Sequence, residues 1–124
     1  MRLRCLASLT LCINGLGADG IVPLAQALPL CGALTSVGLS RNALTLSGVR
    51  ILAAALPRLT SLTLLDLSSN SLEGAGAEEL TKVLPAMASL EELDVQGNRL
   101  RSGSKAVRAL QASVKERDGF TLSL

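Results

Sequence analysis

The stretch LTLLDLSSNSL at residues 62–72 decides the fold, because its frame recurs three times at a constant step of 28 residues. The other copies are LASLTLCINGL at 6–16, LTSVGLSRNAL at 34–44 and LEELDVQGNRL at 90–100. Two further columns keep the same step, with glycines at Gly20, Gly48 and Gly76 and prolines at Pro29, Pro57 and Pro85. Several columns in phase indicate an internal repeat.

The alternation of leucines before each asparagine predicts a short strand with one buried face. Leu65 and Leu67 have the period of two that places both side chains inward, while the residues between them face the other way. The asparagine follows the strand, and its amide can both donate and accept hydrogen bonds from a turn. We therefore expect a ladder of four stacked structural asparagines, Asn14, Asn42, Asn70 and Asn98.

A helical stripe follows each asparagine. Apolar residues recur at i, i+3, i+4 and i+7, as at Val49, Leu52, Ala53 and Leu56. We expect the glycine of each repeat to introduce this helix. We expect the proline to end it, because the residue before a proline is disfavoured in helical geometry. The fourth helix is less regular, and FTLSL at 120–124 is interpreted as a closing strand.

The pattern L-x-x-L-x-L-x-x-N-x-L in units of 28 residues resembles the leucine-rich repeat of the long, ribonuclease-inhibitor-like class. The resemblance covers nearly the whole chain. It implies an α/β fold, a right-handed solenoid that forms a short curved horseshoe with parallel strands on the concave face and helices on the convex face. We expect one domain over 1–124, with repeats at about 6–33, 34–61, 62–89 and 90–117 and the closing strand at 120–124.

The composition limits the chemistry that the chain can perform. Histidine is absent from the 124 residues, which removes the commonest general base and zinc ligand. INGLGADGIV at 13–22 contains G-x-G-x-x-G, the outline of a dinucleotide turn. The strands alternate instead of being apolar on both faces, so we interpret this turn as a repeat junction. We predict no catalytic residue, no cofactor and no metal site.

The charges are segmented along the chain. Residues 1–58 carry five basic and one acidic side chain, residues 59–98 one basic and seven acidic, and residues 99–124 six basic and two acidic. This pattern does not favour a nucleic-acid surface. Prolines interrupt the apolar stretch at 5–40, so we predict no membrane span. Three irregularly spaced cysteines, Cys5, Cys12 and Cys31, indicate a reducing, intracellular and cytoplasmic setting.

The water-facing side of the strands is the candidate partner-binding face. Asp66 and Asp94 fall one strand apart, with Glu92 nearby. The same surface continues past the strands through Ser40, Arg41, Ser68 and Gln96. Clustered like charges are unfavourable unless they are solvated or met by a cation. Two interpretations therefore stay open: a solvated sheet face, or a docking site for a basic segment of a protein partner.

The resemblance implies a non-enzymatic protein–protein interaction module, a scaffold or recognition domain that binds through the concave face. Ran GTPase-activating proteins and the sensor halves of intracellular immune receptors belong to families of this type. The alternatives are therefore regulation of a small GTPase and a fragment of an immune-receptor-type repeat domain. The repeats begin and end without a polar capping unit, which predicts end-to-end self-association or truncation from a longer chain.

Overall fold

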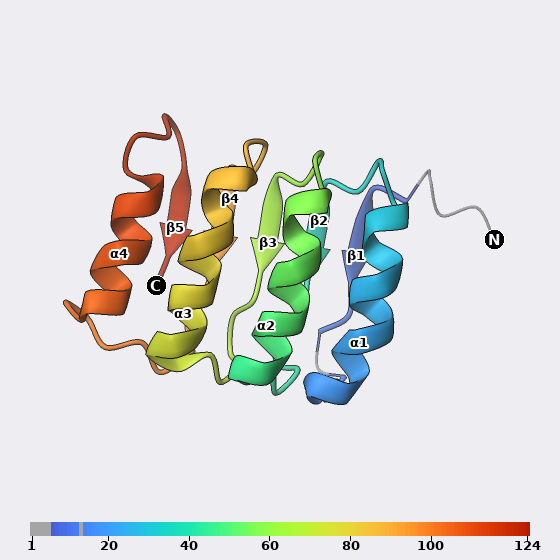
Figure 1. Ribbon diagram of the computed structural model, residues 1–124, viewed down its shortest axis with the longest axis horizontal. Helices are drawn as coiled ribbons and strands as arrows, with labels where there is room; N and C mark the ends of the chain where they lie inside the picture. Colours follow the sequence, from blue (N-terminus) through green and yellow to red (C-terminus); the bar gives the residue numbers. More distant parts are fainter. Residues whose placement is uncertain (1–5, 13) are drawn as a thin grey trace.

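The computed structural model describes residues 6–12 and 14–124, where strands and helices alternate (Figure 1). Cys5, one of the three cysteines considered above, lies outside the described residues. The strands are β1 (Ser8–Thr10), β2 (Ser36–Gly38), β3 (Leu64–Asp66), β4 (Glu92–Asp94) and β5 (Thr121–Ser123). The helices are α1 (Gly17–Ala27), α2 (Leu46–Ala55), α3 (Glu73–Val83) and α4 (Lys105–Val114). Short 3-10 helices follow the first three of these: η1 (Leu28–Leu30), η2 (Leu56–Arg58) and η3 (Leu84–Ala86).

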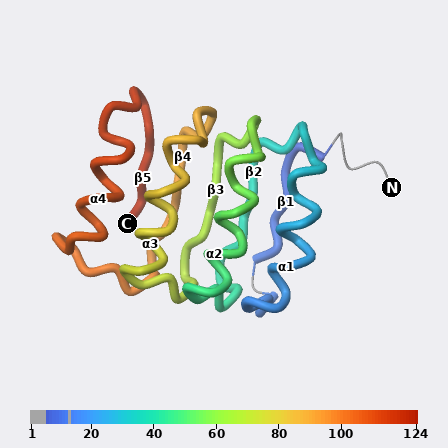
Figure 2. The backbone as a smooth tube through the Cα atoms, viewed as in Figure 1, coloured from blue at the N-terminus to red at the C-terminus, as the bar shows by residue number. Residues whose placement is uncertain are grey.

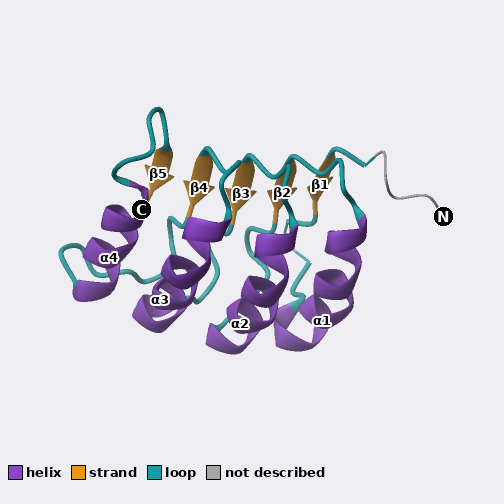
Figure 3. Cartoon of the chain, turned by 45° about the horizontal axis from the view of Figure 1, so that its top comes forward, coloured by secondary structure: helices purple, strands orange, loops and turns teal. Residues whose placement is uncertain are grey.

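All neighbouring strands pair in parallel, in the order β1-β2-β3-β4-β5. Leu65 pairs with Leu93 at the step of 28 residues, and Leu93 pairs with Leu122 of the closing strand at a step of 29. The strands form one layer and the helices cover only one of its faces (Figure 3). The chain trace in Figure 2 advances one strand and one helix at a time along the long axis. These observations confirm the predicted α/β solenoid.

The core lies between the two layers and consists almost entirely of aliphatic side chains. Leu65 and Leu67 of the quoted stretch are 1% and 0% exposed. The predicted stripe of α2 is buried as well, at Val49, Leu52, Ala53 and Leu56. Each fully buried leucine contributes about 2 kcal/mol relative to an exposed one. Within the described ranges, no helix is long and apolar enough to cross a bilayer.

The glycine of each repeat lies inside the first turn of its helix, and not before it as the sequence predicted. α1 begins at Gly17 and α3 at Glu73, whereas the repeated glycines are Gly20 and Gly76. A Cβ added at Gly76 would stand 2.8 Å from the Cβ of Leu72, which is 1% exposed. The position requires glycine because any larger side chain would collide with the buried leucine four residues earlier.

The prolines end the α-helices by a mechanism different from the predicted one. The residue before each proline keeps right-handed helical geometry, as Leu56 does at φ −54° and ψ −43°. The chain tightens there into a 3-10 turn that has the proline in its first positions. Proline fits such a position because the missing N–H would have no helical acceptor.

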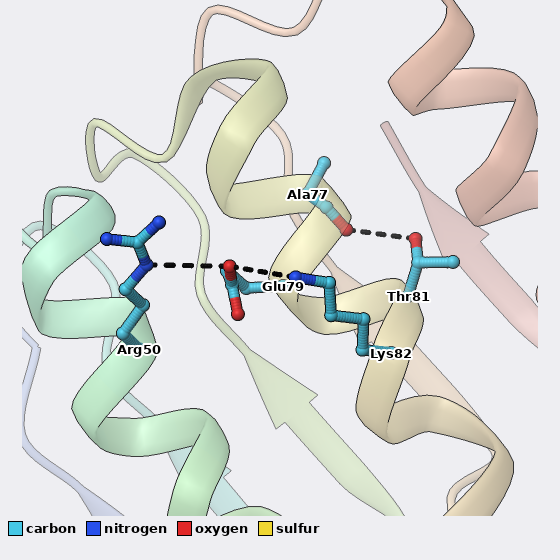
Figure 4. A network of polar contacts seen from close by, with 5 residues as sticks. All are labelled: Arg50, Ala77, Glu79, Thr81 and Lys82. Atoms are coloured by element: carbon cyan, nitrogen blue, oxygen red, sulfur yellow. Dashed lines mark hydrogen bonds and ion pairs between the residues drawn. The ribbon is translucent and has the colours of Figure 1, made fainter.

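A small charged network joins two helices on the convex surface (Figure 4). Glu79 Oε1 of α3 lies 3.2 Å from Lys82 Nζ and 3.4 Å from Arg50 Nε of α2. The hydrogen bond from Lys82 is the main cause that lowers the pKa of Glu79, against an opposing effect of desolvation. A lowered pKa means that the contact stabilises the fold above the ordinary carboxyl pKa and is lost as the pH falls through the lowered value. Exposed pairs of this kind contribute little.

Candidate protein-binding face

The asparagine ladder fixes the turn that follows each strand. The side chain of Asn70 accepts from the backbone N–H groups of Asn42 and Leu44, at 2.9 and 3.1 Å. Its amide nitrogen donates to the carbonyls of Leu39, Leu67 and Ser68. Asn42 and Asn98 make the equivalent sets of bonds, and the three side chains are buried. Each asparagine therefore ties its own turn to the preceding repeat.

Asn14 differs from the other three members of the ladder. Its backbone N–H donates to Asn42 Oδ1 at 3.0 Å, so the residue stands next to Asn42 in the ladder. Its side chain is exposed, and its amide donates to the carbonyl of Cys12 at 3.1 Å. Within the described residues, no repeat lies before it that could supply the two N–H donors seen elsewhere.

The structure brings the three predicted carboxylates together on the open face of the sheet. Asp66 of β3 is the register partner of Asp94 on β4, and Glu92 lies two residues earlier on β4. Asp66 accepts from the N–H of Ser68 and Asp94 from the N–H of Gln96, each at 2.9 Å. These bonds orient both carboxylates. Within residues 6–12 and 14–124, none of the three takes part in an ion pair.

The four remaining predicted residues lie just past the strands and not within them. Ser40, Ser68 and Gln96 stand in the turns after β2, β3 and β4, and their carbonyls accept from the ladder. Arg41 is exposed and has the left-handed φ of 57°. Its N–H bonds the carbonyl of Ser68 at 3.2 Å. These residues border the carboxylates at the carboxyl ends of the strands.

Arg117 is a residue whose role the sequence did not reveal. Its guanidinium donates to the carbonyls of Met87 at 2.8 Å and Leu90 at 3.3 Å, and also to that of Leu84. It lies 5.6 Å from the centre of the Phe120 ring, within cation–π range. The sequence did carry a signal, because the fourth repeat has Ser113 where the others have proline. The last unit therefore lacks the proline 3-10 turn, and Arg117 donates to carbonyls at the start of η3 and just after it.

A hollow of about 720 Å³ opens beside Arg117, at the edge where the strands begin. Its polar lining includes Ser89, Glu91 and Asp118, and Phe120 forms an apolar wall. Among the described residues, no group of three or more histidine, cysteine, aspartate or glutamate side chains could hold a metal ion. Cys12 and Cys31 are free thiols.

Five parallel strands backed on one face by helices, with buried asparagines in the turns after β2, β3 and β4, define a repeat solenoid. The leucine-rich-repeat family model matches residues 58–80. No curated protein matches the sequence. A solved structure described as leiomodin-1 actin-binding site 2 is similar, at 19% identity and a TM-score of 0.84, over 97% of this chain and 70% of that one. Residues 58–80 therefore match the leucine-rich-repeat motif, and the described chain has the leucine-rich-repeat fold.

Proposed function

We propose that this chain is a non-catalytic protein-interaction module whose concave face, the open side of β1–β5, docks a basic segment of a partner. The leucine-rich-repeat fold generally serves protein binding. The observation that carries the proposal is the register pair Asp66 and Asp94 beside Glu92. Free thiols at Cys12 and Cys31 accord with an intracellular, cytoplasmic setting.

The carboxylates suit a cationic ligand because two of them are already oriented. The Asp66 and Asp94 side chains each bond a backbone N–H through Oδ1, which leaves the second oxygen of each carboxylate available to a lysine or arginine. A preorganised site loses less side-chain entropy on binding. The surrounding segment 59–98 carries seven acidic residues and one basic residue, so its field would steer a basic segment toward the face.

The size of the face favours a short segment over a large globular partner. Five strands spaced at about 4.8 Å give a surface roughly 20–25 Å across. A standard interface buries about 800 Å² on each partner. An extended peptide that crosses β3 and β4 fits this smaller area.

The test is binding of a lysine- and arginine-rich peptide, measured by fluorescence anisotropy at low and high salt. Asp66→Asn combined with Asp94→Asn should weaken binding about tenfold, the equivalent of about 1.4 kcal/mol. Asparagine keeps the side-chain oxygen that accepts the turn N–H, so the fold should be unchanged. Glu78→Gln combined with Glu116→Gln removes the same charge from exposed positions outside the sheet. Equal affinity for both double variants would reject the concave site.

The alternative of small-GTPase regulation predicts a different readout. A change in the rate of GTP hydrolysis when the chain is added to a purified small GTPase would support it. Binding without any rate change would support the interaction module. Because a solved structure of similar fold is described as an actin-binding site, actin is the first whole protein to test against the same variants.

A further inference from the structure

The two ends of the solenoid differ in chemistry. Five leucines of the first repeat are half-exposed, whereas the residues 28 positions later are 0–1% exposed. The half-exposed set is Leu6, Leu9, Leu11, Leu16 and Leu24, and the buried set is Leu34, Val37, Leu39, Leu44 and Leu52. In the second and third repeats, the preceding repeat covers these positions. At the first repeat, the described part of the chain contains nothing that does so.

The free side of α1 has the surface that a neighbouring helix needs. Gly48, Leu52 and Ala55 of α2 are buried where α1 packs, and a Cβ at Gly48 would stand 3.7 Å from the Cα of Ala18. The same columns in α1 are Gly20, Leu24 and Ala27, and all three are half-exposed. Small residues beside a leucine allow two helices to approach closely, so α1 presents an unfilled copy of the surface that α2 uses.

The strand layer is open at the same end. The carbonyl of Ala7 and the N–H of Leu11 bond to the β2 side. Because backbone groups alternate along a strand, those of Ser8 and Thr10 point to the outer edge, where they can pair with another strand. The Asn14 side chain, exposed beside this edge, is a further available polar group. Residues 5–40 carry one charged side chain, Asp19, and depletion of charge is typical of an interface core.

The helix at the opposite end presents polar groups. Arg108, Gln111 and Lys115 are exposed on α4, and Arg117 fixes the last turns. A head-to-tail contact would place these cations against the half-exposed leucines of another copy, which is unfavourable because the charges would lose their water. The apolar end is therefore complemented better by a second apolar end than by the basic end.

We infer that the α1/β1 end is a self-association surface, on which two copies of this chain meet about a two-fold axis perpendicular to the sheet. That axis pairs β1 with β1 in antiparallel fashion and places α1 against α1, so both layers continue across the contact. The two five-stranded sheets then form one sheet of ten strands. Such an isologous contact closes at the dimer and leaves both basic ends outside. The inference is independent of what the concave face binds.

The test is the molar mass of the purified chain in solution, measured by sedimentation equilibrium over a wide range of protein concentrations. We expect a reversible monomer–dimer equilibrium. Leu24→Lys should shift it to monomer, because Leu24 lies on the free side of α1, where a lysine reaches water only in the monomer. Gln111→Lys adds the same charge to α4 and should leave the dimer unchanged.

A second variant separates loss of the dimer from loss of the fold. Pro23→Lys places a charge on exposed helix surface next to Leu24 and removes a proline from the helix interior, so it should stabilise the monomer while it weakens the dimer. Circular dichroism confirms that each variant is folded. A wild-type chain that stays monomeric would overturn the inference. Oligomers larger than a dimer would overturn it as well. So would a dimer that dissociates in the Gln111→Lys variant but not in the Leu24→Lys variant.

Discussion

Asn70 shows how one polar residue specifies the turn of a repeat. Its side chain is 6% exposed and makes five hydrogen bonds, two as acceptor and three as donor. An asparagine amide offers both functions, whereas an aspartate would lack the donors and a leucine would lack both. The buried turn groups would otherwise be unsatisfied, which is unfavourable in an apolar interior.

Asn70→Ala should lower the free energy of unfolding by about 3 kcal/mol or more, because the N–H groups of Asn42 and Leu44 lose their acceptor and each unsatisfied buried group costs about 1–3 kcal/mol. Urea unfolding monitored by circular dichroism measures the change.

Asn14→Ala is the matched control for that experiment. Asn14 is exposed and its side chain donates one hydrogen bond, so the loss should stay within about 0.5 kcal/mol. Equal losses for the two variants would show that the ladder does not stabilise the turns.

At the scale of the helix, glycines of α3 have opposite roles although they are two residues apart. A Cβ at Gly76 would come within 2.8 Å of the Cβ of Leu72, whereas a Cβ at Gly74 would lie at an ordinary 3.6 Å from the Cβ of Ala106. Gly74→Ala should stabilise the protein by about 1 kcal/mol through helix propensity. Gly76→Ala should destabilise it by about 1–2 kcal/mol, since overpacking outweighs that gain. Thermal unfolding of both variants gives the two signs, and a gain at Gly76 would contradict the packing argument.

The strands and their register could be predicted from the sequence because the same requirement acts on every repeat. Leu65 and Leu93 must both face the core, and a one-residue slip would move them to water. The helix starts could not be predicted from the repeated glycine. Gly76 recurs at the step of 28 because a side chain there would collide with Leu72, and not because it marks the start of a helix. The prolines ended the helices as expected, but through a 3-10 turn that the general rule for pre-proline residues does not describe.

The candidate site was predictable only where it depends on register. The strand step of 28 placed Asp66 beside Asp94, and their pairing is observed. The bonds from Ser68 and Gln96 that orient these carboxylates arise from turn geometry that the pattern does not encode. Arg117 was not predicted because it lies where the fourth repeat departs from the pattern. The other repeats have no equivalent residue that would have indicated its role.

At the scale of the whole molecule, stability should vary from one end to the other. In a repeat protein each unit contacts only its neighbours, so an end unit is held on one side alone. The first repeat has half-exposed leucines, whereas Leu110 and Val114 of the last helix are buried and the last turns are fixed by Arg117.

Hydrogen exchange should therefore be fastest in α1 and slower in α2, α3 and α4, since exchange reports local opening. Mass spectrometry of peptides from each helix at low protein concentration measures the order. Fastest exchange in α4 would contradict the assigned difference between the ends. Dimerisation through α1 would slow its exchange as the concentration rises, which links this measurement to the self-association test.

The bonds that the ladder forms between repeats run in one direction, from the side chain of each asparagine back to the repeat before it. During translation, the turn at Asn42 therefore stays incomplete until Asn70 has left the ribosome. At about 5–20 residues per second, that interval is roughly 1.4 to 5.6 seconds for each repeat. The turns of the nascent chain are thus completed one repeat behind the repeat that is being synthesised.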